Sequence, residues 1–180
     1  MAMRQERRPP PPLDAAALER LALRYVERFA TTRGKLADYL GRKIRERGWD
    51  GDPADPHALA QRMADLGYVD DRLYAESKAA ALGRKGLGAR RVTMALRQAR
   101  VTQGDADDLA PAIAGRAADA ALTFARRKRI GPFGPGTTDA GPDRAIRDKQ
   151  LAAMLRAGHG FELSRRIVAA RSEEELDELE

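Results

Sequence analysis

The chain has 180 residues, of which 33% are charged and only 5% are aromatic, and its formal net charge at pH 7 is +6. It contains no cysteine, which excludes a disulfide framework, thiolate zinc sites and a cysteine nucleophile. No apolar run approaches the ~20 residues that span a bilayer, and the first residues lack the apolar core of a signal peptide. We therefore expect a soluble, cytoplasmic protein that makes no membrane contact.

Charge is unevenly distributed along the sequence. Residues 173–180 carry six acidic side chains and no basic one, so leaving them out raises the formal charge from +6 to +12 on the preceding 172 residues. A body this basic favours a partner rich in negative charge. The acidic segment is either a disordered tail or a segment that folds back on the body and competes with a nucleic acid. Both alternatives stay open from the sequence.

The first third of the chain predicts a basic, proline-rich tail and three helices. Residues 1–12 hold four consecutive prolines and cannot form a helix, so we expect a disordered tail in preference to an SH3-type ligand. Asp14 should cap a helix that runs to about Ala30. A second helix is expected over 36–47, and Asp55 followed by Pro56 should begin a third, which stops at Gly67.

The middle third predicts two helices joined by a basic turn. Asp70 should cap a helix that ends at Gly83, and the segment 83–88 (GRKGLG) favours a tight connection because three glycines tolerate positive φ. The next helix should bury its apolar stripe and present its cations to solvent or to a polyanion. The stripe is Val92, Ala95, Leu96 and Ala99, and the cations are Arg90, Arg91, Arg97 and Arg100.

The last third predicts a capped helix from Thr102 that Pro111 should kink or shorten, and a helix over 116–129 that ends in four cations. Residues 131–142 (GPFGPGTTDAGP) should form an irregular loop, either disordered or pinned by Phe133. Helices over about 143–157 and 161–170 follow. Large apolar residues expected to face a core include Phe29, Leu66, Leu73, Ile146 and Phe161, and Trp49 should seal the core of the first third.

These helices repeat. Setting Trp49 against Val101 also places Gly34 on Gly86, Leu40 on Val92 and Ile44 on Leu96, and Phe161 stands in the same place in the last third, at spacings of 52 and 60 residues. The sequence therefore predicts an all-α fold of three tandem three-helix repeats, 13–67, 68–114 and 115–171, followed by the acidic tail 172–180. Repeats this small should stack, and we expect an elongated, curved monomer.

Two stretches carry a family resemblance: 68–75 (YVDDRLYA), an acidic pair followed by an aromatic residue and alanine, and 85–92 (KGLGARRV), a glycine-x-glycine and double-arginine stretch. With them the chain resembles, over about 13–170, the RecX family of bacterial regulators of the recombinase RecA. It departs from the family at the loop 131–142, at Pro111 and in the acidic tail.

The resemblance implies an all-helical modulator that lies in the groove of the RecA filament on single-stranded DNA. It would inhibit ATP hydrolysis and strand exchange, promote filament disassembly, and so modulate recombinational DNA repair and the SOS response. No catalytic residue is carried over from the family. The residues carried over as candidate contacts are Arg84, Lys85, Arg90, Arg91 and Arg97.

Exposed cations elsewhere extend the candidate set for contact with a RecA filament or with DNA directly. It comprises Lys35, Arg42, Lys43, Arg84, Lys85, Arg90, Arg91, Arg97, Arg126, Arg127, Lys128, Arg129, Lys149 and Arg156. The alternatives are a sequence-nonspecific DNA-binding helical-repeat protein acting without RecA, a scaffold for acidic proteins, and a solvated basic surface. Because aromatic residues are not interleaved with these cations, backbone contacts fit better than base stacking.

The inventory of side chains does not indicate an enzyme, a cofactor or a metal site. Gly86-x-Gly88 follows no strand and lacks the lysine and hydroxyl of a nucleotide-binding loop. His57 and His159 are too far apart in sequence to suggest a metal site, and we expect both to be exposed at helix ends. The acid pair Asp70 and Asp71 is explained by capping and by the helix dipole.

Overall fold

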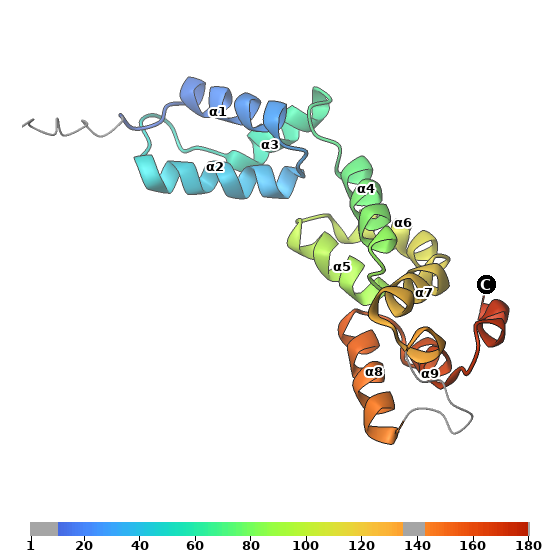
Figure 1. Cartoon of the computed structure of the whole chain (residues 1–180). Helices are drawn as coiled ribbons and strands as arrows, with labels where there is room; N and C mark the ends of the chain where they lie inside the picture. Colours follow the sequence, from blue (N-terminus) through green and yellow to red (C-terminus); the bar gives the residue numbers. More distant parts are fainter. Residues whose placement is uncertain (1–10, 135–142, 180) are drawn as a thin grey trace, which may run out of the picture. The chain divides into compact units, whose positions relative to one another are not determined.

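The computed structural model describes residues 11–134 and 143–179, which are helical apart from turns and one isolated bridge (Figure 1). Residues 1–10 of the predicted tail and 135–142 of the predicted loop lie outside this part of the chain. Two compact units are present, Met1–Tyr74 and Ala75–Glu180, called here the N-terminal and the C-terminal unit. The all-α prediction is confirmed. The division into three repeats and the elongated, curved shape stay predictions.

The N-terminal unit contains α1 (Ala15–Arg28), α2 (Arg33–Arg47) and α3 (Pro56–Asp65). Each begins at a side-chain cap, which supplies an acceptor to an otherwise unpaired N–H group. Asp14 accepts from the N–H of Ala17 at 2.6 Å, and Asp55 accepts from the N–H of His57 at 2.9 Å. Thr32 caps α2, so this helix begins three residues before the predicted start.

The core of the N-terminal unit lies where α2 packs against α1 and α3. Its fully buried side chains include Leu13, Leu36, Leu40 and Met63. The chain ahead of α1 is held by a bridge in which Leu13 donates to the carbonyl of Gly48 at 3.0 Å and accepts from Asp50 at 2.9 Å. Trp49 is partly buried against this core, as predicted.

The C-terminal unit contains most of α4 (Asp71–Arg84), then α5 (Ala89–Gln98), α6 (Gln103–Ala114), α7 (Ala117–Lys128), α8 (Arg144–Arg156) and α9 (Phe161–Ala169). The 3₁₀ turns η1 (Gly131–Phe133) and η2 (Glu174–Leu179) complete it. Phe133 packs against the core, so the described start of the predicted loop is pinned. Pro111 does not end α6, which continues to Ala114.

Four helices of this unit end in the same way. A left-handed residue follows the helix, and the next residue donates to the carbonyl five positions back, which satisfies a terminal carbonyl and buries the chain after it. The left-handed residues are Gly86 (φ 72°), Arg100 (59°), Arg129 (54°) and Gly158 (94°). The closing bonds run from Leu87 to Leu82, Val101 to Leu96, Ile130 to Ala125 and His159 to Met154.

These helix ends correct the alignment of the last predicted repeat with the first two. Trp49 follows Gly48 and Val101 follows Arg100, both of which have positive φ, and the residue that follows Gly158, which also has positive φ, is His159. His159 is 2% exposed whereas Phe161 is 54% exposed. His159 therefore occupies the place that the sequence alignment gave to Phe161, and the expectation that it is exposed at a helix end is wrong.

Other large apolar residues expected in a core are also exposed: Phe29, Leu66, Leu73 and Ile146. Phe29 and Leu66 are C-caps, because α1 and α3 end one or two residues before the predicted positions. Leu73 lies two residues, or about 200° around the helix, from fully buried Ala75. Small shifts in a helix end or in its orientation thus move a large side chain out of the core.

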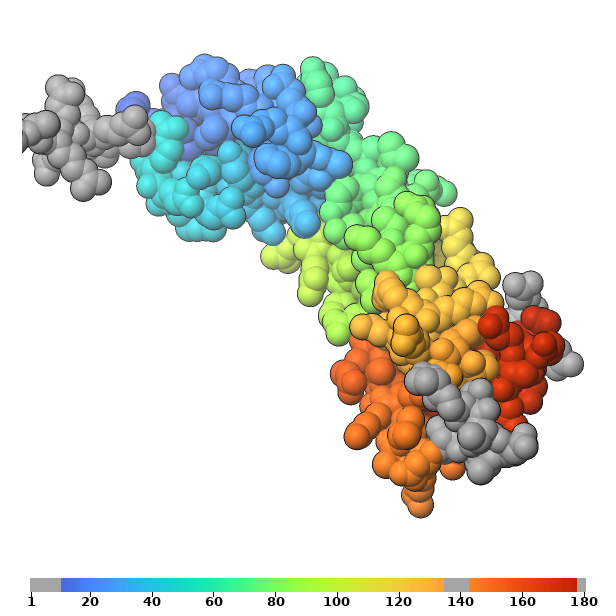
Figure 2. Space-filling view, viewed as in Figure 1, coloured from blue at the N-terminus to red at the C-terminus, as the bar shows by residue number. Residues whose placement is uncertain are grey.

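The core of the C-terminal unit brings together α7, α8 and α9 with the acidic segment. Met154 and Ile167 are fully buried, and Leu176 from the acidic segment is only 4% exposed. Glu173 pairs with Arg126 at 3.3 Å. Figure 2 shows this segment, in red, beside the amber surface of α7. Its described part is therefore held against α7 by an apolar anchor and an ion pair.

Candidate functional site

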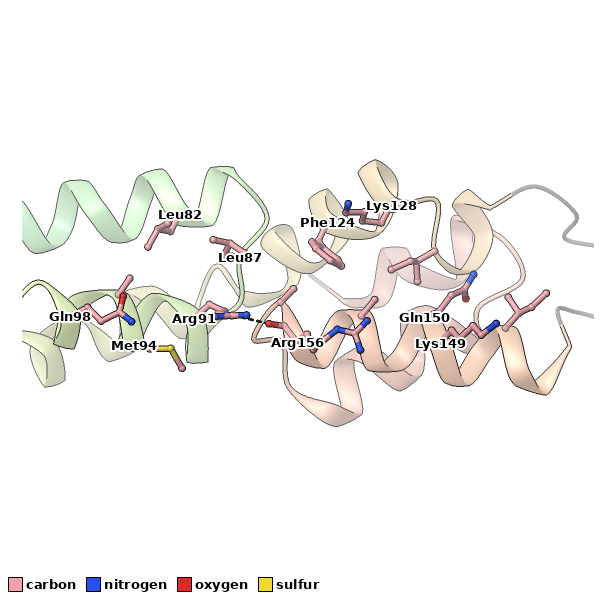
Figure 3. A pocket seen from close by; sticks show the side chains of 15 residues that line it. Leu82, Leu87, Arg91, Met94, Gln98, Phe124, Lys128, Lys149, Gln150 and Arg156 are labelled. Atoms are coloured by element: carbon pink, nitrogen blue, oxygen red, sulfur yellow. Dashed lines mark hydrogen bonds between the residues drawn. The ribbon is translucent and has the colours of Figure 1, made fainter.

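A groove of about 790 Å³ lies within the C-terminal unit, between α5, α7, α8 and the turn after α4 (Figure 3). Its lining is part apolar and part polar. The apolar lining residues, called here the floor, are Leu82, Leu87, Met94, Ala95, Phe124, Ile130, Ile146, Ala153 and Ala157. The polar ones, called here the rim, are Arg91, Lys128, Lys149 and Arg156, together with Gln98 and Gln150. Four of the cations proposed from the sequence are thus brought to one groove.

Helical spacing explains why α5 and α8 each present a mixed face to the groove. Side chains three and four residues apart share one side of a helix. On α5 these are Arg91, Met94, Ala95 and Gln98, and on α8 they are Ile146, Lys149, Gln150, Ala153 and Arg156. Both faces combine cations with apolar residues.

The opposite faces of the same helices are buried. Val92 and Leu96 of α5 are 2% and 0% exposed, and Met154 of α8 is fully buried. Ile146 lies seven residues before Ala153, or about 20° around α8, on the side of the helix that lines the groove, and it is 48% exposed. The prediction that Ile146 faces the core was wrong, and nothing in the sequence showed that this side of α8 borders a groove.

The groove depends on a joint between the beginning of α5 and the end of α8. Gly88 donates its N–H to the carbonyl of Ala157 at 2.9 Å, and Arg90 donates to Gly158 at 3.2 Å. Arg91 Nε donates to the carbonyl of Arg156 at 2.8 Å, the dashed bond in Figure 3. The N–H groups at the start of α5 and the carbonyls at the end of α8 lack partners within their own helices, and here they pair with each other. The opposite ends of the two helix dipoles also attract.

Glycines make this joint possible. A Cβ on Gly88 would lie only 2.3 Å from the carbonyl carbon of Gly158, and one on Gly158 would lie 2.6 Å from the amide nitrogen of Arg91. At Gly86 a Cβ would approach the amide nitrogen of Phe124 to 2.8 Å, and φ is also positive. The glycine-x-glycine pattern thus serves backbone packing.

His159 follows Gly158 of the joint and is buried beside it. Its Nε2 is 3.2 Å from the carbonyl of Gly86, and its ring is 5.5 Å from that of Phe124. Burial lowers the pKa of His159, because a charged imidazolium loses its hydration there, while the bond to Gly86 acts in the opposite direction. Nδ1 is buried without a hydrogen-bond partner in the described structure. The neutral ring is therefore the favoured form.

The rim cations are available for a partner. Arg91, Lys128, Lys149 and Arg156 are exposed, and none pairs with a carboxylate of the described residues. Among the other candidates of this unit, Arg84, Lys85, Arg90, Arg97 and Arg129 are exposed outside the groove. Arg126 pairs with Glu173, and Arg127 donates to the carbonyl of Lys85 at 2.7 Å.

The candidates on α2 have different surroundings, within the N-terminal unit. Lys43 Nζ and Arg42 Nε lie 2.6 Å and 3.6 Å from the carboxylate of Glu46, and both cations lie over the ring of Tyr39. The hydrogen bond from Lys43 is the main cause that lowers the pKa of Glu46. Lys35 Nζ is 5.9 Å from the ring of Tyr74. Aromatic residues do therefore accompany cations here, contrary to the interpretation from sequence.

The acid pair at the start of α4 has two roles. Asp70 caps the helix by accepting from the N–H of Leu73 at 2.8 Å. Asp71 instead accepts from the backbone N–H of Arg33 at 2.8 Å and from its Nε at 3.2 Å, and its side chain is 5% exposed. Asp71 thus joins the beginning of α4 to the beginning of α2. A helix N-cap needs only one acceptor side chain. The presence of a second aspartate was therefore the signal in the sequence that Asp71 has another role.

Two further properties concern the whole described part of the chain. None of its helices combines the length and the apolar character needed to cross a membrane. No group of three or more His, Asp or Glu side chains in residues 11–134 and 143–179 is arranged to hold a metal ion.

Comparison with known proteins identifies relatives over most of the chain. It is 31% identical over 161 residues to the regulatory protein RecX of Myxococcus xanthus, covering 84% of this chain and 83% of that protein. It is 30% identical over 162 residues to the regulatory protein RecX of Agrobacterium fabrum, covering 87% and 84%. No protein-family model matches the sequence.

Solved structures show the same fold. The crystal structure of RecX from Lactobacillus salivarius matches with a TM-score of 0.61 at 18% identity, covering 90% of this chain and 96% of that one. A crystal structure of regulatory protein RecX matches with a TM-score of 0.56 at 21% identity, covering 84% and 72%. With an all-helical fold in common and 30% identity to two relatives over most of their length, the chain belongs to the RecX family of regulatory proteins.

Proposed function

We propose that this protein binds the filament that RecA forms on single-stranded DNA, inhibits its ATP hydrolysis and strand exchange, and so modulates recombinational DNA repair and the SOS response. It acts in the cytoplasm as a monomer and performs no catalysis of its own. Membership in a family of regulatory proteins supports this role. The observation that carries it is the groove of the C-terminal unit, with four exposed cations that no carboxylate of the described residues neutralises.

The physical argument rests on where the positive charge is placed. A nucleoprotein filament presents phosphates and acidic protein surface, and cations that are already solvated and unpaired lose little when they meet it. Four such cations around one concave site give a partner several contacts at once. Rim cations mainly raise the association rate, so inhibition should weaken as salt increases.

The test is the DNA-dependent ATPase activity of RecA, measured with substoichiometric protein at a salt concentration where binding to naked DNA is negligible. We expect inhibition by the intact chain and weaker inhibition by the double variant Lys149→Ala, Arg156→Ala. The matched control is Arg84→Ala, Arg97→Ala, which removes two exposed cations outside the groove. Arg91 is left intact because its side chain also bonds the joint.

A second function, sequence-nonspecific DNA binding without RecA, is favoured by the exposed cations Arg84, Arg90 and Arg97 outside the groove. The same assay separates the two functions. Absence of ATPase inhibition under conditions that abolish DNA binding would contradict the proposal and favour direct DNA binding. Equal inhibition by both double variants would contradict the assignment to the groove.

A further inference from the structure

We propose that the groove of the C-terminal unit binds an acidic protein segment with apolar anchor side chains, and not the sugar–phosphate backbone of DNA. The inference rests on the proposed function only in identifying the partner. If that function holds, the segment belongs to the recombinase. The chemistry of the groove argues for this occupant independently. The mode is that of an amphipathic segment laid into an apolar groove, with cations at the rim.

The floor of the groove suits aliphatic side chains. Met94 of α5 and Ile146 of α8 are each 48% exposed, and both line the groove. Large apolar residues that stay exposed along a concavity mark a binding site, and an unbranched methionine adapts to partners of different shape. A volume of about 790 Å³ leaves room for several side chains. Covering this floor is the favourable step that a hydrophilic polyanion cannot supply.

Base stacking is not available here. Single-strand binders place bases on exposed aromatic faces. Phe124 lines the groove but is only 7% exposed, and its ring already contacts His159 at 5.5 Å and Arg127 at 5.6 Å. The other lining side chains are aliphatic or polar. A DNA strand would therefore satisfy the rim and leave the floor exposed, which favours a protein partner.

The cations of the rim favour a partner with acidic side chains. Arg91, Lys128, Lys149 and Arg156 line the same groove as the apolar floor, and each lacks a carboxylate partner among the described residues. Carboxylates of an incoming segment would supply the missing charge. The chain's own acidic segment is not the occupant, because Leu176 is buried in the core beside α7 and Glu173 pairs with Arg126. The groove is thus complementary to an acidic, amphipathic segment from another protein.

The experiment uses the full chain and three fluorescent probes in anisotropy titrations. The first is a synthetic helical peptide with leucines on one face and glutamates on the other. The second has the same glutamates and serine in place of leucine, and the third is an oligothymidylate. We expect the first probe to bind at least tenfold more tightly than the second, which corresponds to about 1.4 kcal/mol. The oligothymidylate should compete weakly.

Variants locate the binding. Met94→Glu places a negative charge on the floor and should weaken binding of the leucine peptide at least tenfold. Its matched control is Leu73→Glu, at an apolar residue that is 60% exposed and does not line the groove. Lys149→Glu should also weaken binding, whereas Arg97→Glu, an exposed cation of α5 outside the groove, should not. Circular dichroism checks that all four variants remain folded.

Equal binding of the leucine and serine peptides, or loss of binding in Leu73→Glu to the same extent as in Met94→Glu, would overturn the proposal. Tight oligothymidylate binding that Lys149→Glu removes would assign the groove to DNA instead. The two proposals fail separately. Peptide binding without RecA inhibition would overturn the proposed function and leave the groove proposal standing. RecA inhibition by a chain that does not bind the leucine peptide would overturn the groove proposal and leave the proposed function standing.

Discussion

Helix α2 of the N-terminal unit and helices α5 and α8 of the C-terminal unit are all basic, but they use their cations differently. On α2, Arg42 and Lys43 meet the carboxylate of Glu46 four and three residues further along the same helix. On α5, the positions three and four residues after Arg91 hold Met94 and Ala95, which line the groove. Arg42 and Lys43 thus pair with an acid on their own helix, whereas Arg91 has no acid at the corresponding positions.

The beginnings of these helices also differ. At the start of α2, a carboxylate of α4 meets the N–H of Arg33. At the start of α5, carbonyls from the end of α8 take that role, and two glycines allow the backbones to touch. The first contact is a tether made by one side chain, and the second is a joint made by backbone. Loss of the joint should therefore lower the free energy of unfolding more than loss of the tether does.

The largest effect is expected from Gly88→Ala. The new Cβ would lie 2.3 Å from the carbonyl carbon of Gly158, and neither backbone can move without breaking the bonds of the joint. We expect a loss of about 3 kcal/mol in the free energy of unfolding, measured by urea denaturation. The control is Gly83→Ala in α4, where a Cβ meets nothing within 4 Å and should leave stability unchanged or raise it by up to about 1 kcal/mol.

Asp71→Asn tests the tether and should have the second largest effect. The substitution removes the negative charge that two N–H groups of Arg33 share, at a site where the carboxyl is 5% exposed. We expect a loss of about 2 kcal/mol in the free energy of unfolding. Asp70→Asn is the matched control, because asparagine caps helices about as well as aspartate. Equal destabilisation by the two would contradict the tether.

Acidification should weaken the joint through His159. Its folded-state pKa is lowered by burial, so the unfolded chain takes up a proton first as the pH falls below 6.5. Stability contributed by the neutral ring is full above that pH and declines until the pH reaches the lower, folded-state pKa. We expect His159→Gln to flatten this part of the pH profile of thermal unfolding. His57→Gln, at an exposed residue, should keep the wild-type slope.

The smallest effect is expected from Glu46→Gln, which sharpens the comparison of the basic helices. The change removes the carboxylate that pairs with Arg42 and Lys43 at the surface, so the free energy of unfolding should hardly change. The two freed cations should raise retention on a heparin column at low salt. Unchanged retention would show that pairing with Glu46 is not what distinguishes α2 from α5 and α8.

Much of the fold could be predicted because it depends on local chemistry. Asp14, Asp55, Asp70 and Thr102 cap the helices that they were expected to cap, since a side-chain acceptor and a free N–H group meet within one turn. Buried stripes such as Val92 and Leu96 follow from helical spacing. The errors lie at helix ends, where one residue decides whether an apolar side chain such as Phe29 or Phe161 is covered, and in the orientation of a helix, as at Leu73.

The candidate site was predicted in part. Arg91, Lys128, Lys149 and Arg156 were among the cations chosen from the sequence, but nothing in the sequence singled out these four from the rest. They come from three helices whose approach depends on backbone contacts at Gly88 and Gly158. The apolar floor was missed for the same reason. Met94 stands on the polar side of α5, and only the approach of other helices makes it part of a groove.

By itself, the sequence determined the helices, their caps, the basic character of α2, α5 and α8 and the family, because each depends on residues close together in the chain. The tertiary structure alone decided that Asp71 is a tether, that His159 is buried and that four cations share one groove. These depend on contacts between residues up to 73 positions apart, as between Gly86 and His159. Backbone approach at glycines sets the contacts of His159 and of the groove, and helical periodicity carries no information about any of these contacts.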